Sequence, residues 1–235
     1  MYRKSHAVRT FLCLLLTFVF VTVFSTQPLL AASDQETSVA WPEAPLTNSG
    51  AACLMDADTG AILFDANMDE QRYPASITKV MTALLVAENK QPTDTVTFGE
   101  QAVSESIPGN ARIDVQLSET ITVEDALHAI LLASANEVCT QLAIDIAGSV
   151  EAFADMMNER AAALGCINTH FTNPNGLPDP NHYTTAHDMA LIMQEAIKNE
   201  TFLRVESDLS YTIQPTNMTA APRQLQNHHV MLFQD

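Results

Sequence analysis

Ser76 and Lys79 are the two residues whose types and spacing best suit covalent chemistry. They follow Pro74 and precede an apolar run without helix breakers, so the pattern predicts a helix with Ser76 in its first turn. Residues three apart share a helix face, which brings Ser76 Oγ near Lys79 Nζ. A neutral, buried lysine can remove the proton that keeps a serine hydroxyl unreactive, and N–H groups at a helix start can stabilise an oxyanion. Chance supplies about one such spacing in a chain of this length, so the pair needs support from elsewhere.

Ser134 and Asn136 form a second polar pair, at a predicted junction between two apolar helices. Two residues apart in a tight loop, they can point toward one cleft. The serine could relay a proton to a leaving amine, and the amide could hold a substrate carbonyl. Serine and asparagine are also common loop and cap residues, so a purely structural role is the alternative.

The first 32 residues have the pattern of an export signal rather than of a folded domain. Arg3, Lys4 and Arg9 precede an almost wholly apolar run at 11–24, and small residues at 31–33 offer a cleavage site after Ala32. The run is short for a membrane span, and an uncleaved anchor is the alternative. We expect a signal peptide at 1–32, a polar linker at 33–46, and an extracytoplasmic protein of the cell envelope or periplasm.

Net charge and cysteine content limit the classes of partner and of scaffold. Loss of residues 1–32 lowers the formal charge from −17 to −20, because that segment carries three basic residues and no acidic one. Such a balance argues against nucleic acid and against adhesion to anionic lipid by surface charge. Cys53, Cys139 and Cys166 then remain, an odd number without regular spacing. One disulfide is possible, and Cys139 lies on an apolar stretch typical of a core.

The elements that must position the two polar pairs are mainly helices. Capping residues and apolar periodicity predict helices after Ser76, from Thr122, from Glu137, from Ser149 and from Thr185, the last ending near Lys198. Short apolar runs predict a β-hairpin around 58–60, a strand at 95–98 and strand-like pieces from Thr201 onward, whereas 100–121 reads as irregular. The whole pattern is typical of one α+β domain.

Two other peptidase chemistries are suggested by single motifs. Asp58-Thr59-Gly60 matches the aspartic-protease triplet, but that chemistry needs two facing copies and the sequence has one. His182 and His187 could suggest zinc, yet a spacing of five does not place two ligands on one helix face. Thr185 and Asp188 are better explained as helix caps. We therefore expect no metal and no cofactor.

The order of the motifs, Ser-x-x-Lys and then Ser-x-Asn, is that of penicillin-recognising serine enzymes. The flanking text resembles more closely the D-alanyl-D-alanine carboxypeptidases, the low-molecular-mass penicillin-binding proteins of serine peptidase family S11. The resemblance covers roughly residues 45–235. Its segments are 55–60, 72–79, 122–127, 173–177 and 182–190.

The resemblance implies a β-lactamase/transpeptidase-like domain, a helical cluster packed on an antiparallel sheet. It implies that Ser76 attacks the carbonyl between the two terminal D-alanines of a peptidoglycan stem peptide and that Lys79 takes its proton. Ser134 would help to protonate the departing D-alanine, Asn136 would position the substrate, and water would hydrolyse the acyl-enzyme. β-Lactams would acylate Ser76 as mimics of the D-Ala-D-Ala group.

One element of the family is missing from this sequence. No Lys-Thr-Gly occurs, and no lysine follows Lys198. In the family that strand binds the substrate carboxylate and completes the oxyanion hole, and one lost oxyanion donor costs about 100–1,000-fold in rate. We therefore interpret 47–235 as an incomplete catalytic domain without its C-terminal strands, and we expect weak or no acylation of the chain as given. A non-catalytic penicillin- or peptidoglycan-binding fragment and a serine β-lactamase are the alternatives.

Overall fold

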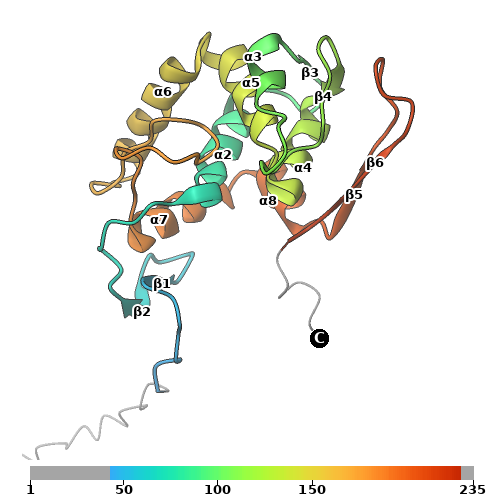
Figure 1. Ribbon diagram of the computed structural model, residues 1–235. Helices are drawn as coiled ribbons and strands as arrows, with labels where there is room; N and C mark the ends of the chain where they lie inside the picture. Colours follow the sequence, from blue (N-terminus) through green and yellow to red (C-terminus); the bar gives the residue numbers. More distant parts are fainter. Residues whose placement is uncertain (1–42, 229–235) are drawn as a thin grey trace, which may run out of the picture. The chain divides into compact units, whose positions relative to one another are not determined.

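The computed structural model describes residues 43–228, and those from Pro45 onward belong to one compact unit (Figure 1). Residues 43–48 have neither helix nor strand. The predicted signal peptide and most of the predicted linker lie outside the described residues.

Helices make up most of the regular structure, as the sequence predicts for an α+β domain. They surround α2, which packs against α4, α5, α6, α7 and α8 (Figure 1). The helical elements are the 3-10 turn η1 (Ala75–Thr78), α2 (Lys79–Asn89), α3 (Glu100–Ser104), α4 (Val123–Ala133), α5 (Asn136–Ala147), α6 (Val150–Ala163), α7 (Ala186–Ala196) and α8 (Glu200–Ser207).

The strands of the described chain pair only locally. Instead of the one antiparallel sheet that the resemblance implies, three separate two-stranded antiparallel sheets are present, β1–β2, β3–β4 and β5–β6. The predicted hairpin around 58–60 is confirmed as β1–β2, which packs against α7. The strands are β1 (Ala52–Met55), β2 (Ile62–Ala66), β3 (Thr95–Thr97), β4 (Thr120–Thr122), β5 (Ser210–Ile213) and β6 (Arg223–Gln226).

Side-chain caps begin the predicted helices where the sequence placed them. Thr122 and Asp125 form a reciprocal capping box at the start of α4. Ser149 accepts from the N–H of Ala152 at α6, and Thr185 accepts from the N–H of Asp188 at α7. The interpretation of Asp188 as a cap is wrong, because its carboxylate accepts from Asn168 N and from Thr169 Oγ1 and so ties α7 to the preceding loop.

Two short helices in the structure are not predicted by the sequence patterns. Residues 100–121 were expected to be irregular, yet they begin with α3, and the strand-like pieces expected from Thr201 are preceded by α8. Asn199 caps α8 by accepting from the N–H groups of Thr201 and Phe202. Each helix is so short that it buries only one or two residues, which leaves too little periodicity to detect.

Helix α2 is central because an unbroken run within it, residues 81–86, is buried. Met81, Ala83, Leu84, Leu85 and Val86 are all at most 4% exposed and belong to the core. Burying such side chains contributes roughly 1.5–3 kcal/mol for each large one. The same packing fixes the first residue of the helix, Lys79.

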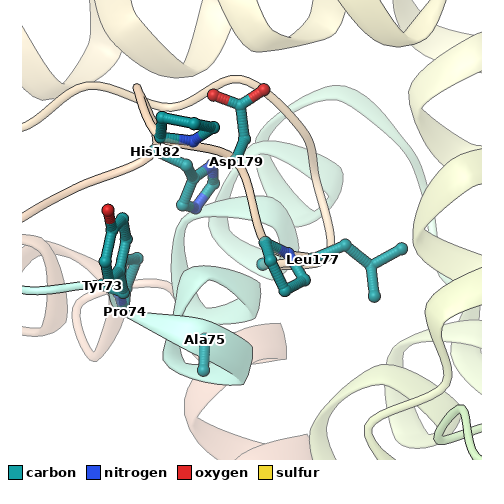
Figure 2. A pocket seen from close by; sticks show the side chains of 9 residues that line it. Tyr73, Pro74, Ala75, Leu177, Asp179 and His182 are labelled. Carbon is teal, nitrogen blue, oxygen red and sulfur yellow. The ribbon is translucent and has the colours of Figure 1, made fainter.

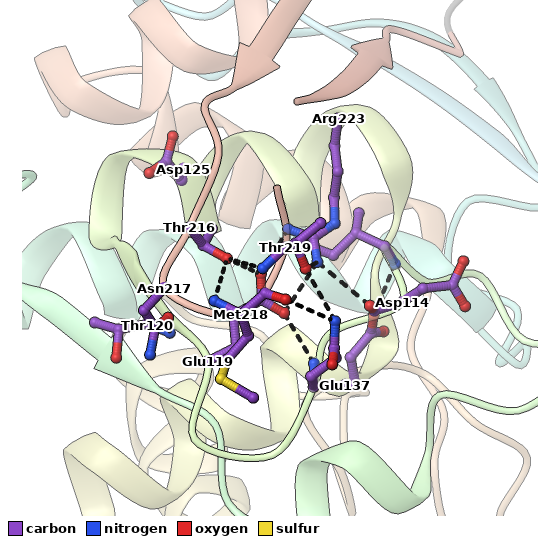
Figure 3. Close-up of polar contacts among 12 residues, drawn as sticks. Asp114, Glu119, Thr120, Asp125, Glu137, Thr216, Asn217, Met218, Thr219 and Arg223 are labelled. Atoms are coloured by element: carbon purple, nitrogen blue, oxygen red, sulfur yellow. Dashed lines mark hydrogen bonds and ion pairs between the residues drawn. The ribbon is translucent and has the colours of Figure 1, made fainter. Parts of the chain in front are cut away.

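A buried ion pair fastens the β5–β6 hairpin to the segment that precedes β4 (Figure 3). The carboxylate of Glu119, which is 0% exposed, pairs with Arg223 Nη1 at 2.8 Å and accepts from Arg223 Nη2 at 3.0 Å. Thr216 Oγ1 donates to the same carboxylate at 2.6 Å. We call Glu119, Thr216 and Arg223 the hairpin clamp.

No helix within residues 43–228 is both long and apolar enough to cross a membrane.

Candidate active site

The amine of Lys79 is the centre of a buried polar cluster. Its Nζ lies 3.2 Å from Ser76 Oγ, 2.8 Å from Asn136 Oδ1 and 2.7 Å from the carbonyl oxygen of Asn175. Lys79 is only 3% exposed. We call Ser76, Lys79, Asn136 and Asn175 the lysine cluster. Three of the four predicted site residues are thus in contact or share a partner, and Asn175 is an addition.

Ser76 and Lys79 meet because the chain makes a 3-10 turn between them. Ser76 lies within η1, and Lys79 begins α2. The predicted helix start is therefore a 3-10 turn that leads into an α-helix, and in a 3-10 turn side chains three apart are eclipsed. Ala75, directly before the serine, has a φ of 49°, a left-handed conformation that strains a residue with a Cβ.

The loop 173–177 lies directly against this turn and supplies a partner for the lysine. The sequence reading identified it only as a turn and as a segment of the family resemblance. Thr82 Oγ1 donates to Pro174 O at 2.6 Å, which attaches the loop to α2. A Cβ on Gly176 would lie 1.9 Å from Ala75 O, and Gly176 has a φ of +82°. Only glycine permits this approach, which holds the carbonyl of Asn175 against Lys79.

Ser134 and Asn136 come from the junction between α4 and α5. Asn136 begins α5, and its backbone N–H donates to Ala111 O at 2.9 Å while its side chain accepts from Lys79. Ser134 ends α4 with a left-handed φ of 57°. Its Oγ is buried and finds no hydrogen-bond partner in the part of the chain that the structure describes. Its role stays a prediction.

Behind the lysine cluster lies a carboxylate that the sequence reading missed. Glu105 Oε2 accepts from Thr140 Oγ1 at 2.8 Å and from Asn175 Nδ2 at 3.0 Å. Burial raises the pKa of Glu105. No sequence signal could have found it, because Glu105 stands in a polar segment without a motif.

Burial disfavours the charged form of Lys79. Removal from water lowers the pKa of Lys79 below its ordinary value, while interactions with Cys139, Glu137 and Glu105 act in the opposite direction and do not cancel it. Cys139 is fully buried, as predicted, and burial raises the pKa of its thiol to about 12. The three cysteines of the described chain are free. Within residues 43–228, no cluster of three or more potential metal ligands occurs.

Both ring nitrogens of His182 have hydrogen-bond partners, and one of these lies in the serine turn. Thr172 N–H donates to its Nδ1 at 3.0 Å, so the neutral ring carries its proton on Nε2. That nitrogen lies 2.8 Å from Thr78 Oγ1, in η1. Burial lowers the pKa of His182, which favours this neutral form.

A cavity of about 400 Å³ opens beside the serine turn (Figure 2). Figure 2 shows Tyr73 and Leu177 on opposite sides of this space. Because Ala75 and Gly176 both line it, a group that enters lies against the backbone that carries Ser76. Its remaining lining residues are Pro74, Pro178, Asp179, Pro180 and His182.

A serine on a 3-10 turn, 3.2 Å from a buried lysine amine that also contacts an asparagine of α5, is an arrangement that suits serine acyl transfer. The family model for D-alanyl-D-alanine carboxypeptidase, peptidase S11, matches residues 38–232. The chain belongs to this family.

Curated relatives carry the same name. The sequence is 34% identical over 195 residues to D-alanyl-D-alanine carboxypeptidase DacA of Haemophilus influenzae, covering 81% of this chain and 48% of the relative. It is 36% identical over 181 residues to D-alanyl-D-alanine carboxypeptidase DacF of Bacillus subtilis, covering 71% and 46%. The chain thus spans about half the length of the curated relatives it matches.

Solved structures of penicillin-binding proteins share the fold. Penicillin binding protein 5 from Haemophilus influenzae matches with a TM-score of 0.73 and 32% identity, over 80% of this chain and 55% of that one. Penicillin binding protein 6B from Escherichia coli matches with a TM-score of 0.75 and 31% identity, over 84% and 63%. The predicted α+β, transpeptidase-like class is confirmed.

Proposed function

We propose that this chain carries the nucleophile and base of a serine-type D-Ala-D-Ala carboxypeptidase. The observation that carries the proposal is the set of partners around Lys79 Nζ. A neutral amine has two N–H groups and one lone pair. Asn136 Oδ1 and Asn175 O can only accept, so they take the two N–H groups. The lone pair is then left for the third partner, the hydroxyl of Ser76.

The reaction follows from these positions. Ser76 Oγ attacks the carbonyl between the two terminal D-alanines of a stem peptide, and its proton passes to Lys79. Ser134 then relays that proton from Lys79 to the nitrogen of the departing D-alanine, which leaves the lysine neutral again. Because Asn136 Oδ1 is engaged by Lys79, its Nδ2 is the group that donates to a substrate carbonyl. Water then hydrolyses the ester on Ser76 and restores the hydroxyl.

The proposed substrate is peptidoglycan ending in D-Ala-D-Ala, and β-lactams are the proposed covalent inhibitors. The names of the curated relatives and of the similar penicillin-binding structures support this choice. The sequence contains no Lys-Thr-Gly, so we expect residues 33–235 alone to react slowly. Each oxyanion donor that is not supplied costs about 100–1,000-fold.

Labelling with a fluorescent penicillin tests the proposal in two proteins. One is residues 33–235, and the other, called the chimera, continues with the segment of Bacillus subtilis DacF that follows its matched region. We expect weak labelling of the first and rapid labelling of the chimera, with the adduct on Ser76 by peptide mass spectrometry. Labelling that persists in the Ser76→Ala chimera would contradict the mechanism.

The same experiment separates the alternatives. Acylation of the chimera without release of D-alanine from a D-Ala-D-Ala peptide would favour a non-catalytic penicillin-binding module. Rapid release of hydrolysed penicillin would favour a serine β-lactamase.

We propose further that the protein is exported. The basic residues before the apolar run at 11–24 and the small residues at 31–33 support this location. N-terminal sequencing of the protein from a cell-envelope fraction should begin at Ser33. Recovery of uncleaved protein in the cytoplasm would contradict export.

A further inference from the structure

The side chain of Asn175 is held on both sides, and this determines where its backbone carbonyl lies. Its Nδ2 donates to Glu105 Oε2 at 3.0 Å and lies 3.4 Å from Thr140 Oγ1, and its Oδ1 accepts from the N–H of Leu177 at 3.2 Å. Asn175 is 3% exposed and Thr140 is 0% exposed. The loop 173–177 itself therefore holds the Oδ1 end of the Asn175 amide, and Glu105 accepts from the Nδ2 end.

We propose that Glu105 is a positioning residue for the amine of Lys79, acting through Thr140 and Asn175 to fix the carbonyl beside that amine. The carbonyl of Asn175 accepts from Nζ at 2.7 Å, the shortest of the three contacts of the amine. Holding it in place directs the lone pair of neutral Lys79 at Ser76. The inference rests on the function proposed above.

The charge of Glu105 has a second effect on the same amine. Burial alone makes Lys79 a weak base, and a nearby carboxylate strengthens its affinity for the proton that it takes from Ser76. Glu105, Glu137 and Cys139 are the titratable groups that act on Lys79. Glu137 differs from Glu105 because its carboxylate accepts from Ile113 N–H and, within the described residues, makes no side-chain hydrogen bond with Thr140 or Asn175. Cys139 stays a neutral thiol.

The sequence makes this amine unusually easy to follow in solution. The chain has only four lysines, Lys4, Lys79, Lys90 and Lys198. In protein labelled with ¹³C-lysine, the ε-carbon of each reports its own protonation, and Lys79→Arg assigns the signal of interest. The signals of Lys90 and Lys198 serve as internal references. The measurement needs no acylation, so its failure is distinguishable from failure of the proposed function.

In the full chain, Glu105→Gln should lower the titration midpoint of Lys79 by about one pH unit, the effect of losing one nearby buried charge. Glu105→Asp should restore most of it. Glu100→Gln, which removes an exposed carboxylate from α3, the helix that ends directly before Glu105, should leave the midpoint unchanged. An unchanged Lys79 midpoint in folded Glu105→Gln protein, or an equal shift in Glu100→Gln, would overturn the proposal.

Thr140→Val provides a second variant if Glu105→Gln fails to fold. It removes one of the two donors that favour ionised Glu105 while keeping the shape of the side chain. The Lys79 midpoint should shift in the same direction by a smaller amount. A shift upward, or none, would count against Glu105 as the group that positions the amine.

Discussion

Two buried polar clusters in this chain differ in whether the charged group has a direct counter-ion. In the lysine cluster, Lys79 is surrounded by a hydroxyl, an amide oxygen and a backbone carbonyl, none of which is a counter-ion. In the hairpin clamp, Glu119 is paired directly with Arg223. Burial acts to raise the pKa of Glu119, but hydrogen bonds from Arg223 and Thr216 outweigh it and hold that pKa below its ordinary value.

The difference is the one expected between the proposed catalytic group and a structural one. Neutral partners solvate an amine without committing it to the charged form, so Lys79 can exchange a proton. A direct ion pair commits both partners to charge, which suits an element that must stay fastened. Burial alone therefore does not tell the two apart, whereas the partners do.

Replacement of the lysine should give the largest effect. We expect Lys79→Met to reduce acylation of the chimera by about 100–10,000-fold, the usual contribution of a positioned base. Because an uncharged side chain removes the burial cost of the amine, the melting temperature should not fall. Stopped-flow penicillin binding and calorimetry measure the two quantities. Loss of stability together with activity would show that Lys79 is structural, as Glu119 is.

The clamp should respond in the reverse way. Glu119→Ala leaves Arg223, whose side chain is 13% exposed, without its counter-ion and should lower the free energy of unfolding by about 3–5 kcal/mol. Denaturant unfolding measures this loss. Glu70→Gln is the matched control, because the Arg72–Glu70 pair is about half exposed and should contribute at most about 1 kcal/mol. Equal losses in the two variants would remove the basis of the comparison.

Gly176→Ala tests the contact that brings the loop 173–177 onto the serine turn. The added Cβ would collide with Ala75 O, so we expect a loss of about 3 kcal/mol in unfolding free energy and of most acylation. Gly109→Ala shares a positive φ but meets nothing within 4 Å, and should lose only about 1–2 kcal/mol. Similar losses at both glycines would argue that strain alone matters.

Acid should affect the two groups by different routes. The lowered pKa of Lys79 means that its neutral form is fully present above that pKa, so acylation should fall about tenfold per pH unit below it. The lowered pKa of Glu119 stabilises the fold above its unfolded value of about 4.3, and this stability is lost as pH falls through the folded pKa. Glu119→Gln should therefore reduce the loss of unfolding free energy as pH falls. The decrease of the acylation rate at low pH should stay unchanged.

Ser134→Gly should give the smallest change in stability. It also tests whether Ser134 takes part in proton transfer during acylation. Glycine relieves the left-handed backbone, so stability should rise by up to about 1 kcal/mol while acylation of the chimera falls. Ser118→Gly, which has a φ of 64° on an exposed residue, should raise stability similarly without changing the rate. An unchanged rate in Ser134→Gly would exclude Ser134 from the reaction.

The sequence by itself determined the local features of this protein. Ser76 and Lys79 meet because they lie three positions apart in a helical turn, and caps such as Thr122 and Ser149 act within three residues of their partners. The β1–β2 hairpin and the core face of α2 are equally local. The spacing of Ser134 and Asn136 suggested that the amide could hold a substrate carbonyl, and the family resemblance supported this role.

Only the tertiary structure decided what surrounds the amine of Lys79. Asn175 lies 96 residues further along the chain and contributes a backbone carbonyl, which every residue type has. Glu105 reaches Asn175 across 70 residues, from the C-cap of a short helix that no periodicity revealed. Such contacts depend on how helices pack around α2, and that packing is set by the whole core. The sequence could therefore propose the nucleophile and its base, whereas the uncharged partners around the amine emerged from the fold.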